Sequence, residues 1–138
     1  MTRLEWKQYH MLQAEQASTR STCSRLQVGA VVVLDHHVLS TGYNGAPRGL
    51  THCDHSAVNE PCKVAVHAEA NALIFAPYPL GDTFLGEPEL YVTHAPCVGC
   101  ASLAVNKGIQ RVYFRDYYST SGGLDVFRKA GVYYEQVD

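Results

Sequence analysis

Residues 66–76 read Val-His-Ala-Glu-Ala-Asn-Ala-Leu-Ile-Phe-Ala, and Pro77 follows them. The run is rich in helix-forming residues and stops at a proline, which cannot continue a helix, so it predicts a helix. Residues 97–107 predict a second helix, with Pro96 just before it and Gly108 just after it as a C-cap. Between the two, residues 90–93 form a short apolar run bounded by turn residues and predict a strand.

The flanking sequence continues this alternation of helices and strands. Leu4, Met11 and Leu12 repeat at helical spacing, which predicts a helix from about residue 4 to residue 19. Residues 28–34 and 38–43 predict a β-hairpin, residues 111–114 and 132–134 predict two more strands, and residues 124–129 predict a helix between those strands. The order predicts an α/β fold in one domain, residues 1–138: a three-layer α-β-α sandwich around a mixed, roughly five-stranded sheet.

Composition restricts the class of partner. The chain has 138 residues, 46% of them hydrophobic, a formal net charge of -2 and a pI near 6.4, which suits one compact domain and gives no electrostatic reason to bind nucleic acid. Residues 1–10 mix charged and apolar side chains, and no run approaches the length of a membrane span. We therefore expect a cytoplasmic protein that acts on a small molecule, without a membrane or nucleic-acid partner.

Four residues in two short motifs, His67-Ala68-Glu69 and Pro96-Cys97-Val98-Gly99-Cys100, predict a metal centre. One imidazole and two thiolates leave the fourth position of a tetrahedral zinc open for water, which is typical of a catalytic site. Cys97 and Cys100 lie three residues apart at the start of a helix, so their sulfurs share a face and the helix dipole favours thiolates. The alternatives are buried cysteines without a metal, or a closed structural zinc with His94 as its fourth ligand, which would leave Glu69 without a purpose.

The same residues indicate the chemistry. Zinc activates water near neutral pH, and Glu69 can accept a proton from that water and pass it first to a ring nitrogen and then to a departing amine. Attack at an amidine-type carbon then releases ammonia. The pattern H-x-E followed by P-C-x-x-C is an established signature of zinc deaminases.

From about Leu26 to Gly131 the chain resembles the deoxycytidylate (dCMP) deaminases of the zinc-dependent cytidine deaminase superfamily, especially the phage-encoded and late-competence members. The motifs that carry the resemblance are Val28-Gly29-Ala30, Gly42-Tyr43-Asn44-Gly45 with Pro47 and Gly49, His67-Ala68-Glu69-Ala70-Asn71-Ala72, Tyr91-Val92-Thr93, Pro96-Cys97-x-x-Cys100-Ala101, and Gly108-Ile109. The resemblance implies a cytidine deaminase-like fold and hydrolysis of dCMP to dUMP and ammonia, which supplies the precursor of dTMP. The alternatives are a deaminase of dCTP or of 5-substituted dCMP and, less favoured, a polynucleotide-editing deaminase.

The resemblance also assigns roles to residues of this chain. It implies His67, Cys97 and Cys100 as zinc ligands, Glu69 as the proton shuttle, the Ala68 backbone as a contact to the pyrimidine, and Asn44, Asn71 and Tyr118 as pocket residues. An aromatic residue in or beside the sheet is the alternative reading of Tyr118. For the 5′-phosphate, the charged candidates that flank these motifs are Arg25, Arg48 and Arg115.

Three of the five cysteines lie outside the catalytic motif and predict a second zinc. Cys23, Cys53 and Cys62, with His55 favoured over His52 as the fourth ligand, would form a closed structural site. The site would fix the irregular segment between the hairpin and the helix at 66–76, and cysteines at positions 23 and 53 match ligands of a structural zinc in many dCMP deaminases. Buried cysteines without a metal are the alternative.

Regulation and assembly are expected from the resemblance alone. It implies dCTP and dTTP as effectors and a homo-oligomer, commonly a hexamer. However, residues 75–79 read Phe-Ala-Pro-Tyr-Pro and lack the basic residue that regulated members carry just beyond the helix with H-A-E. An unregulated enzyme and one that binds its effector differently both stay open.

Overall fold

The computed structural model describes residues 2–52, 64–77, 80, 86–118 and 122–138. Within these residues the elements are α1 (Trp6–Ser18), β1 (Gly29–Leu34), β2 (His37–Tyr43), α2 (Ala68–Phe75), β3 (Glu89–His94), α3 (Val98–Lys107), β4 (Arg111–Asp116), α4 (Gly123–Ala130) and β5 (Tyr133–Gln136). The α/β prediction is confirmed, and each predicted helix and strand has its counterpart with bounds that differ by a few residues.

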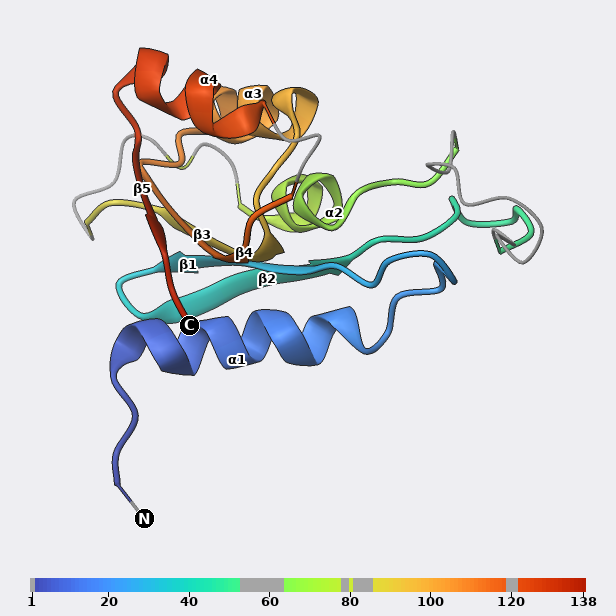
Figure 1. The fold of residues 1–138 in the computed structure, drawn as a ribbon, viewed down its shortest axis with the longest axis horizontal. Coiled ribbons are helices and arrows are strands. Elements are labelled where there is room, and N and C mark those ends of the chain that lie inside the picture. Colours follow the sequence, from blue (N-terminus) through green and yellow to red (C-terminus); the bar gives the residue numbers. More distant parts are fainter. Residues whose placement is uncertain (1, 53–63, 78–79, 81–85, 119–121) are drawn as a thin grey trace.

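The five strands form one mixed sheet in the order β2-β1-β3-β4-β5. β1 pairs antiparallel with both β2 and β3, whereas β3, β4 and β5 run parallel. Figure 1 shows α1 alone on one face of the sheet and α2, α3 and α4 on the other, which confirms the three-layer sandwich.

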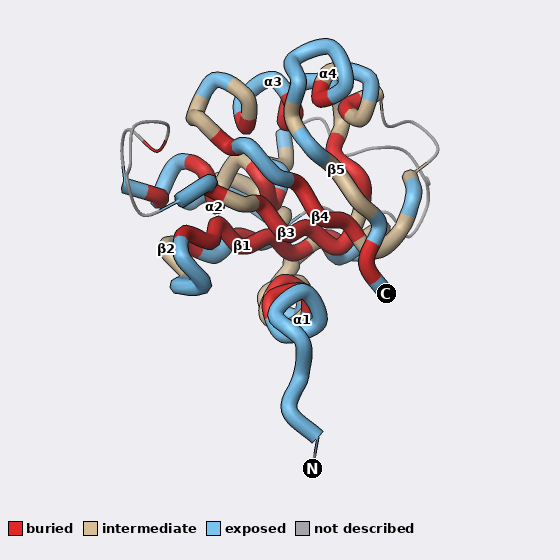
Figure 2. The backbone as a smooth tube through the Cα atoms, turned by 90° about the vertical axis from the view of Figure 1, so that its left-hand side faces the viewer, coloured by how far each residue is buried: buried red, intermediate tan, exposed pale blue. Residues whose placement is uncertain are grey.

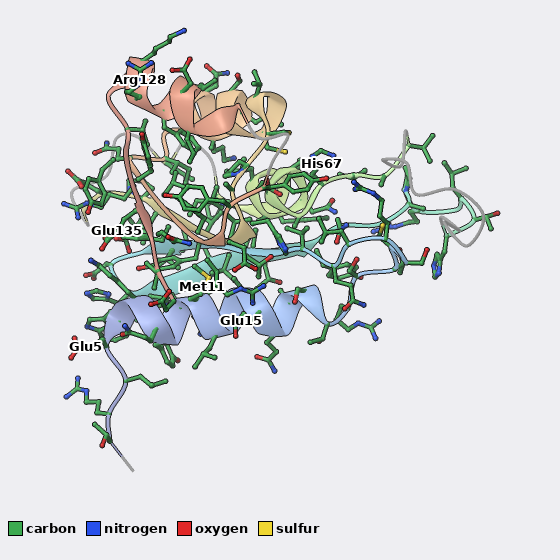
Figure 3. The ribbon with its side chains drawn as sticks, in the orientation of Figure 1. Glu5, Met11, Glu15, His67, Arg128 and Glu135 are labelled. Atoms are coloured by element: carbon green, nitrogen blue, oxygen red, sulfur yellow. The ribbon has the colours of Figure 1, made fainter. Side chains whose placement is uncertain are left out.

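The central strands are buried on both faces, as expected for a sheet covered by helices (Figure 2). On β1, Ala30 and Val32 belong to the core beneath α2, α3 and α4, whereas Val31 and Val33 pack toward α1. Figure 3 shows Met11 on α1 beside the sheet, and this side chain is 1% exposed.

Glycine at position 42 lets α2 lie directly on β2. A Cβ added to Gly42 would lie against the backbone of α2 and only 2.5 Å from the Ala72 amide nitrogen. Nearby, the buried Ser40 hydroxyl donates to the Ala72 carbonyl across 2.5 Å, which ties the same helix to the same strand. The position of α2 is therefore fixed by backbone contact as well as by side-chain packing.

We expect Gly42→Ala to lower the free energy of unfolding by about 1–3 kcal/mol, since strand and helix backbone must separate to admit the methyl group. Urea unfolding followed by circular dichroism measures the change. Gly99→Ala is the matched control, because a Cβ on Gly99 meets nothing within 4 Å and alanine stabilises a helix relative to glycine. Equal stability of the Gly42→Ala variant and the unmodified protein would contradict the direct contact between β2 and α2.

Candidate functional site

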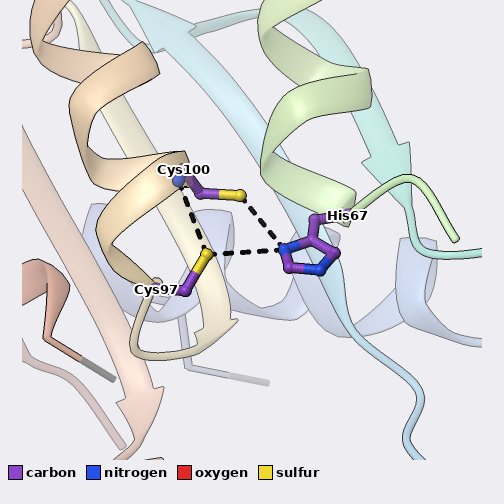
Figure 4. A group of neighbouring side chains, drawn as sticks. All are labelled: His67, Cys97 and Cys100. Carbon is purple, nitrogen blue, oxygen red and sulfur yellow. Dashed lines mark hydrogen bonds between the residues drawn. The ribbon is translucent and has the colours of Figure 1, made fainter. Parts of the chain in front are cut away.

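His67 and Cys97 occupy equivalent positions, each at the N-cap of a helix. His67 precedes α2 and Cys97 precedes α3, and both have extended backbone rather than the helical backbone expected from the sequence. The Cys97 sulfur accepts a hydrogen bond from the Cys100 amide at 3.5 Å, so a thiol takes the capping role usually played by a short oxygen side chain. Two helix starts therefore converge at one point (Figure 4).

The geometry of these three side chains fits a tetrahedral zinc. The His67 Nδ1 atom lies 3.3 Å from the Cys100 sulfur and 3.5 Å from the Cys97 sulfur. With the usual zinc–ligand distances, a nitrogen and a sulfur on a tetrahedral zinc would be about 3.6 Å apart. Among the described residues, these three form the one group of His, Cys, Asp or Glu side chains whose ligand atoms lie close enough to hold a metal ion.

Burial shapes the protonation of the candidate ligand Cys100. It raises the pKa of the Cys100 thiol, and the nearby Glu69 and Cys97 raise it further. The sequence argument that a helix start favours a thiolate is therefore outweighed by desolvation at this residue. A thiolate here requires a cation beside it, which a metal ion would supply.

Glu69 lies in the first turn of α2, with 5% of its surface exposed. Burial raises the pKa of its carboxyl group above the ordinary value, although the backbone, His67 and Cys100 act in the opposite direction. A carboxyl group in this environment holds a proton more readily than an exposed one, as an acid–base catalyst near neutral pH requires.

A cavity of about 180 Å³ opens beside this group. His67, Glu69 and Cys97 contribute to its wall. Arg25 and Tyr118 also line it, and Arg25 Nη1 donates a hydrogen bond to the Tyr118 hydroxyl at 3.1 Å. The lining residues are Cys23, Arg25, Leu26, Val28, Asn44, Ala65, His67, Ala68, Glu69, His94, Ala95, Cys97 and Tyr118. Arg25 is the one lysine or arginine among them.

Asn44 shapes the cavity by fixing the backbone of its wall. Its side-chain oxygen accepts from the Val28 amide, and its side-chain nitrogen donates to the Leu26 carbonyl, each at 2.8 Å. Ala68, the first residue of α2, is fully buried and also lines the cavity. The structure thus brings Arg25, Asn44, Ala68 and Tyr118 together around the predicted zinc ligands.

The other predicted substrate residues lie elsewhere. Asn71 donates to the Tyr43 carbonyl at 2.9 Å and lines a second hollow that Arg48 also lines. Arg115 forms ion pairs with Glu15 at 3.0 Å and with Asp116 at 2.9 Å, and it does not line the catalytic cavity. The placements of Asn71, Arg48 and Arg115 therefore separate them from the cavity beside Glu69.

Two cavity residues, His94 and Cys23, were considered from the sequence only in other roles. His94 was considered only as a fourth zinc ligand, and Cys23 only as a ligand of the second zinc, yet both line the cavity. For His94 the available signal was its position three residues before Cys97, directly after the predicted strand. The proposed ligands Cys53, Cys62 and His55 lie outside the described residues, so the second zinc stays a prediction.

Comparison with known proteins identifies the family. The family model for the cytidine and deoxycytidylate deaminase zinc-binding region matches residues 4–116. ComE operon protein 2 of Bacillus subtilis is 37% identical over 146 aligned positions, which cover 100% of this chain and 74% of that protein. A deoxycytidylate deaminase of Mycobacterium phage D29 is 41% identical over 129 positions, covering 83% of this chain and 97% of the relative.

A solved structure agrees with the sequence comparisons. The dCMP deaminase of cyanophage S-TIM5, crystallised with dCMP and dUMP, superimposes with a TM-score of 0.84 at 33% identity and covers 99% of this chain and 100% of its own. No helix in the described part of this chain has the length and apolar character needed to cross a membrane. The zinc-ligand geometry, the matched zinc-binding region and these relatives agree, and the chain belongs to the cytidine and deoxycytidylate deaminase family.

Proposed function

We propose that this protein hydrolyses dCMP to dUMP and ammonia, with His67, Cys97 and Cys100 holding the zinc. The observation that carries the proposal is the buried Glu69 beside this ligand group, in a cavity that also contains Arg25. Relatives named deoxycytidylate deaminase, and a similar structure containing dCMP and dUMP, support this choice of substrate. The reaction supplies the precursor of dTMP.

Glu69 is proposed to move the protons of the reaction. When bound, zinc lowers the pKa of a water ligand to about 7 and so supplies a nucleophile at neutral pH. Glu69 accepts a proton from the attacking water and delivers it to the ring nitrogen next to the amino-bearing carbon. It then transfers the second water proton to the departing amine, so that water and dCMP yield dUMP and ammonia.

Arg25 and Tyr118 are proposed to bind the 5′-phosphate. Their hydrogen bond joins a guanidinium, which pairs well with phosphate oxygens, to a hydroxyl that can also donate. Arg115 does not line the cavity, and Arg48 lies on the second hollow, so Arg25 is the candidate that the cavity favours. We assign base contacts to the Ala68 backbone and the wall fixed by Asn44.

Ammonia release from a panel of substrates tests the proposed function. The panel contains dCMP, CMP, dCTP, deoxycytidine and a short single-stranded oligonucleotide. Turnover that strongly favours dCMP supports the proposal. Faster turnover of dCTP or of the oligonucleotide would keep the deaminase chemistry and overturn the assigned substrate.

We expect Arg25→Gln to raise the KM for dCMP by about 10- to 100-fold, the size of a lost charge-assisted hydrogen bond. Deoxycytidine has no phosphate, so its kcat/KM should change little. Steady-state kinetics on both substrates measure the difference. Arg20→Gln removes the same charge from an exposed residue that does not line the cavity and should behave like the unmodified protein. An equal loss on both substrates would contradict a phosphate contact by Arg25.

We propose that dCTP and dTTP act as effectors at the second hollow, whose lining includes Gly42 and Tyr43 at the end of β2 and Gly45 just beyond it. Arg48 on its wall provides the positive charge that residues 75–79 lack. Assay of dCMP turnover with and without added dCTP or dTTP tests this role.

We also propose a homo-oligomer, expected to be a hexamer, that is cytoplasmic and consists of single-domain subunits without nucleic-acid or membrane partners. Two large apolar side chains, Ile74 on α2 and Leu103 on α3, are 67% and 52% exposed and line the same hollow. Apolar side chains grouped on a surface are typical of a subunit contact. Light scattering measures the mass of the assembly.

A further inference from the structure

We propose that His94 is a positioning residue that holds Tyr118 in place and thereby sets the preference for a phosphorylated nucleotide. This inference rests on the proposed function, because it concerns how the same cavity recognises the 5′-phosphate. His94 is the last residue of β3 and lines the cavity together with Tyr118 and Arg25.

The buried Thr93 hydroxyl orients the His94 ring. It accepts a hydrogen bond from the Gly29 amide at 3.2 Å and lies 2.8 Å from His94 Nδ1. The hydroxyl has one proton to donate, and donation to Nδ1 places the ring proton on Nε2. Nε2 then faces the Asp116 carboxylate, 3.8 Å away, with favourable polarity.

The groups around His94 agree with this arrangement. Burial lowers the pKa of His94, which favours the neutral ring that the acceptor role of Nδ1 requires. Asp116 on β4 is paired with Arg115, and Arg115 is paired in turn with Glu15 on α1. The ring therefore lies between the ends of β3 and β4, with the Thr93 hydroxyl in hydrogen-bond contact on one side and the Asp116 carboxylate 3.8 Å away on the other.

His94 contacts Tyr118, one of the two proposed phosphate-binding residues, through an aromatic interaction. The His94 and Tyr118 rings lie edge to face, with centroids 6.5 Å apart and an interplanar angle of 78°. The hydroxyl of Tyr118 accepts the hydrogen bond from Arg25. Tyr118 is the second residue after β4 ends at Asp116, so it lies outside the strand and contacts His94 and Arg25 from there.

Steady-state kinetics of His94→Ala test the inference, with the ratio of kcat/KM for dCMP to kcat/KM for deoxycytidine as the readout. We expect this ratio to fall about tenfold, mainly through a higher KM for dCMP, since one hydrogen-bonding group is misplaced. His94→Phe keeps a ring edge against Tyr118 and should stay within about threefold of the original ratio. His37→Ala, at an exposed histidine that starts β2, is the matched control.

A double-mutant cycle tests whether His94 acts through Tyr118. Tyr118→Phe alone should lower the ratio, and adding His94→Ala to it should lower the ratio no further, because residues that act as a unit are not additive. Additive losses would overturn the inference. So would a His94→Ala variant that loses activity equally on both substrates, or one whose ratio is unchanged.

The outcome can be separated from that of the proposed function. If the unmodified protein does not prefer dCMP, the proposed function fails before any variant is compared. If it prefers dCMP and the His94 variants keep that preference, the proposed function stands and the role of His94 is wrong. Zinc content and melting temperature, measured on each variant, identify a loss that comes from misfolding.

Discussion

Glu69→Gln is expected to lower kcat for dCMP by at least about 10⁴-fold, because one carboxylate serves several proton transfers that each contribute strongly. Glutamine has nearly the same size and fits the same buried space, but its amide cannot accept and return a proton. The three candidate ligands His67, Cys97 and Cys100 are unchanged, so zinc content should equal that of the unmodified protein. Ammonia release and elemental analysis of the purified variant measure both quantities.

The matched control is Glu135→Gln, which makes the same change at an unrelated carboxylate. Glu135 lies on β5 and pairs with Lys7 of α1. It should retain full activity. A Glu69→Gln variant with ordinary rates and a full complement of zinc would show that another group moves the protons, and the assigned mechanism would be wrong.

Cys97→Ala is expected to remove one equivalent of zinc per chain. We expect turnover to fall by at least about 10³-fold, since water away from a metal has a pKa far above that of zinc-bound water. Dialysis against a chelator should inactivate the unmodified protein in the same way. Added Zn²⁺ should then restore the stripped protein but not the variant.

Ser102→Ala provides the control on the same helix. Its exposed hydroxyl donates to the Val98 carbonyl and touches none of the candidate ligands. This variant should keep both its zinc and its activity. If Cys97→Ala also keeps its zinc and its activity, the zinc that supports catalysis is bound elsewhere in the chain. This conclusion does not depend on how many zinc ions the whole protein holds.

The sequence was sufficient for the architecture because its boundaries are marked by residues with strong local preferences. Pro77 ends the predicted helix, and Gly108 adopts a left-handed backbone at the end of α3, as a glycine C-cap requires. The helix starts were less predictable, because His67 and Cys97 are not the usual N-cap residues. Cys97 becomes one through its sulfur, which accepts a backbone hydrogen bond.

The candidate ligands could be predicted because their spacing is local, whereas the cavity wall depends on contacts between distant segments. Arg115 appeared as suitable a phosphate ligand as Arg25 until folding placed Arg25, and not Arg115, on the cavity wall. Asn71 lies two residues after Glu69, but the helical turn directs its amide to the Tyr43 carbonyl instead. The surroundings of His94 have the same origin, since Tyr118 meets it only in the folded protein.

The paired helix starts have a consequence for local order. His67 is 30 residues from Cys97 and 33 from Cys100 along the chain, so a metal ion bound by all three would act as a reversible cross-link between α2 and α3. Helix ends normally open more readily than helix centres. A ligand that binds only the closed arrangement stabilises it by mass action. Added zinc should therefore slow amide hydrogen exchange at the starts of both α2 and α3.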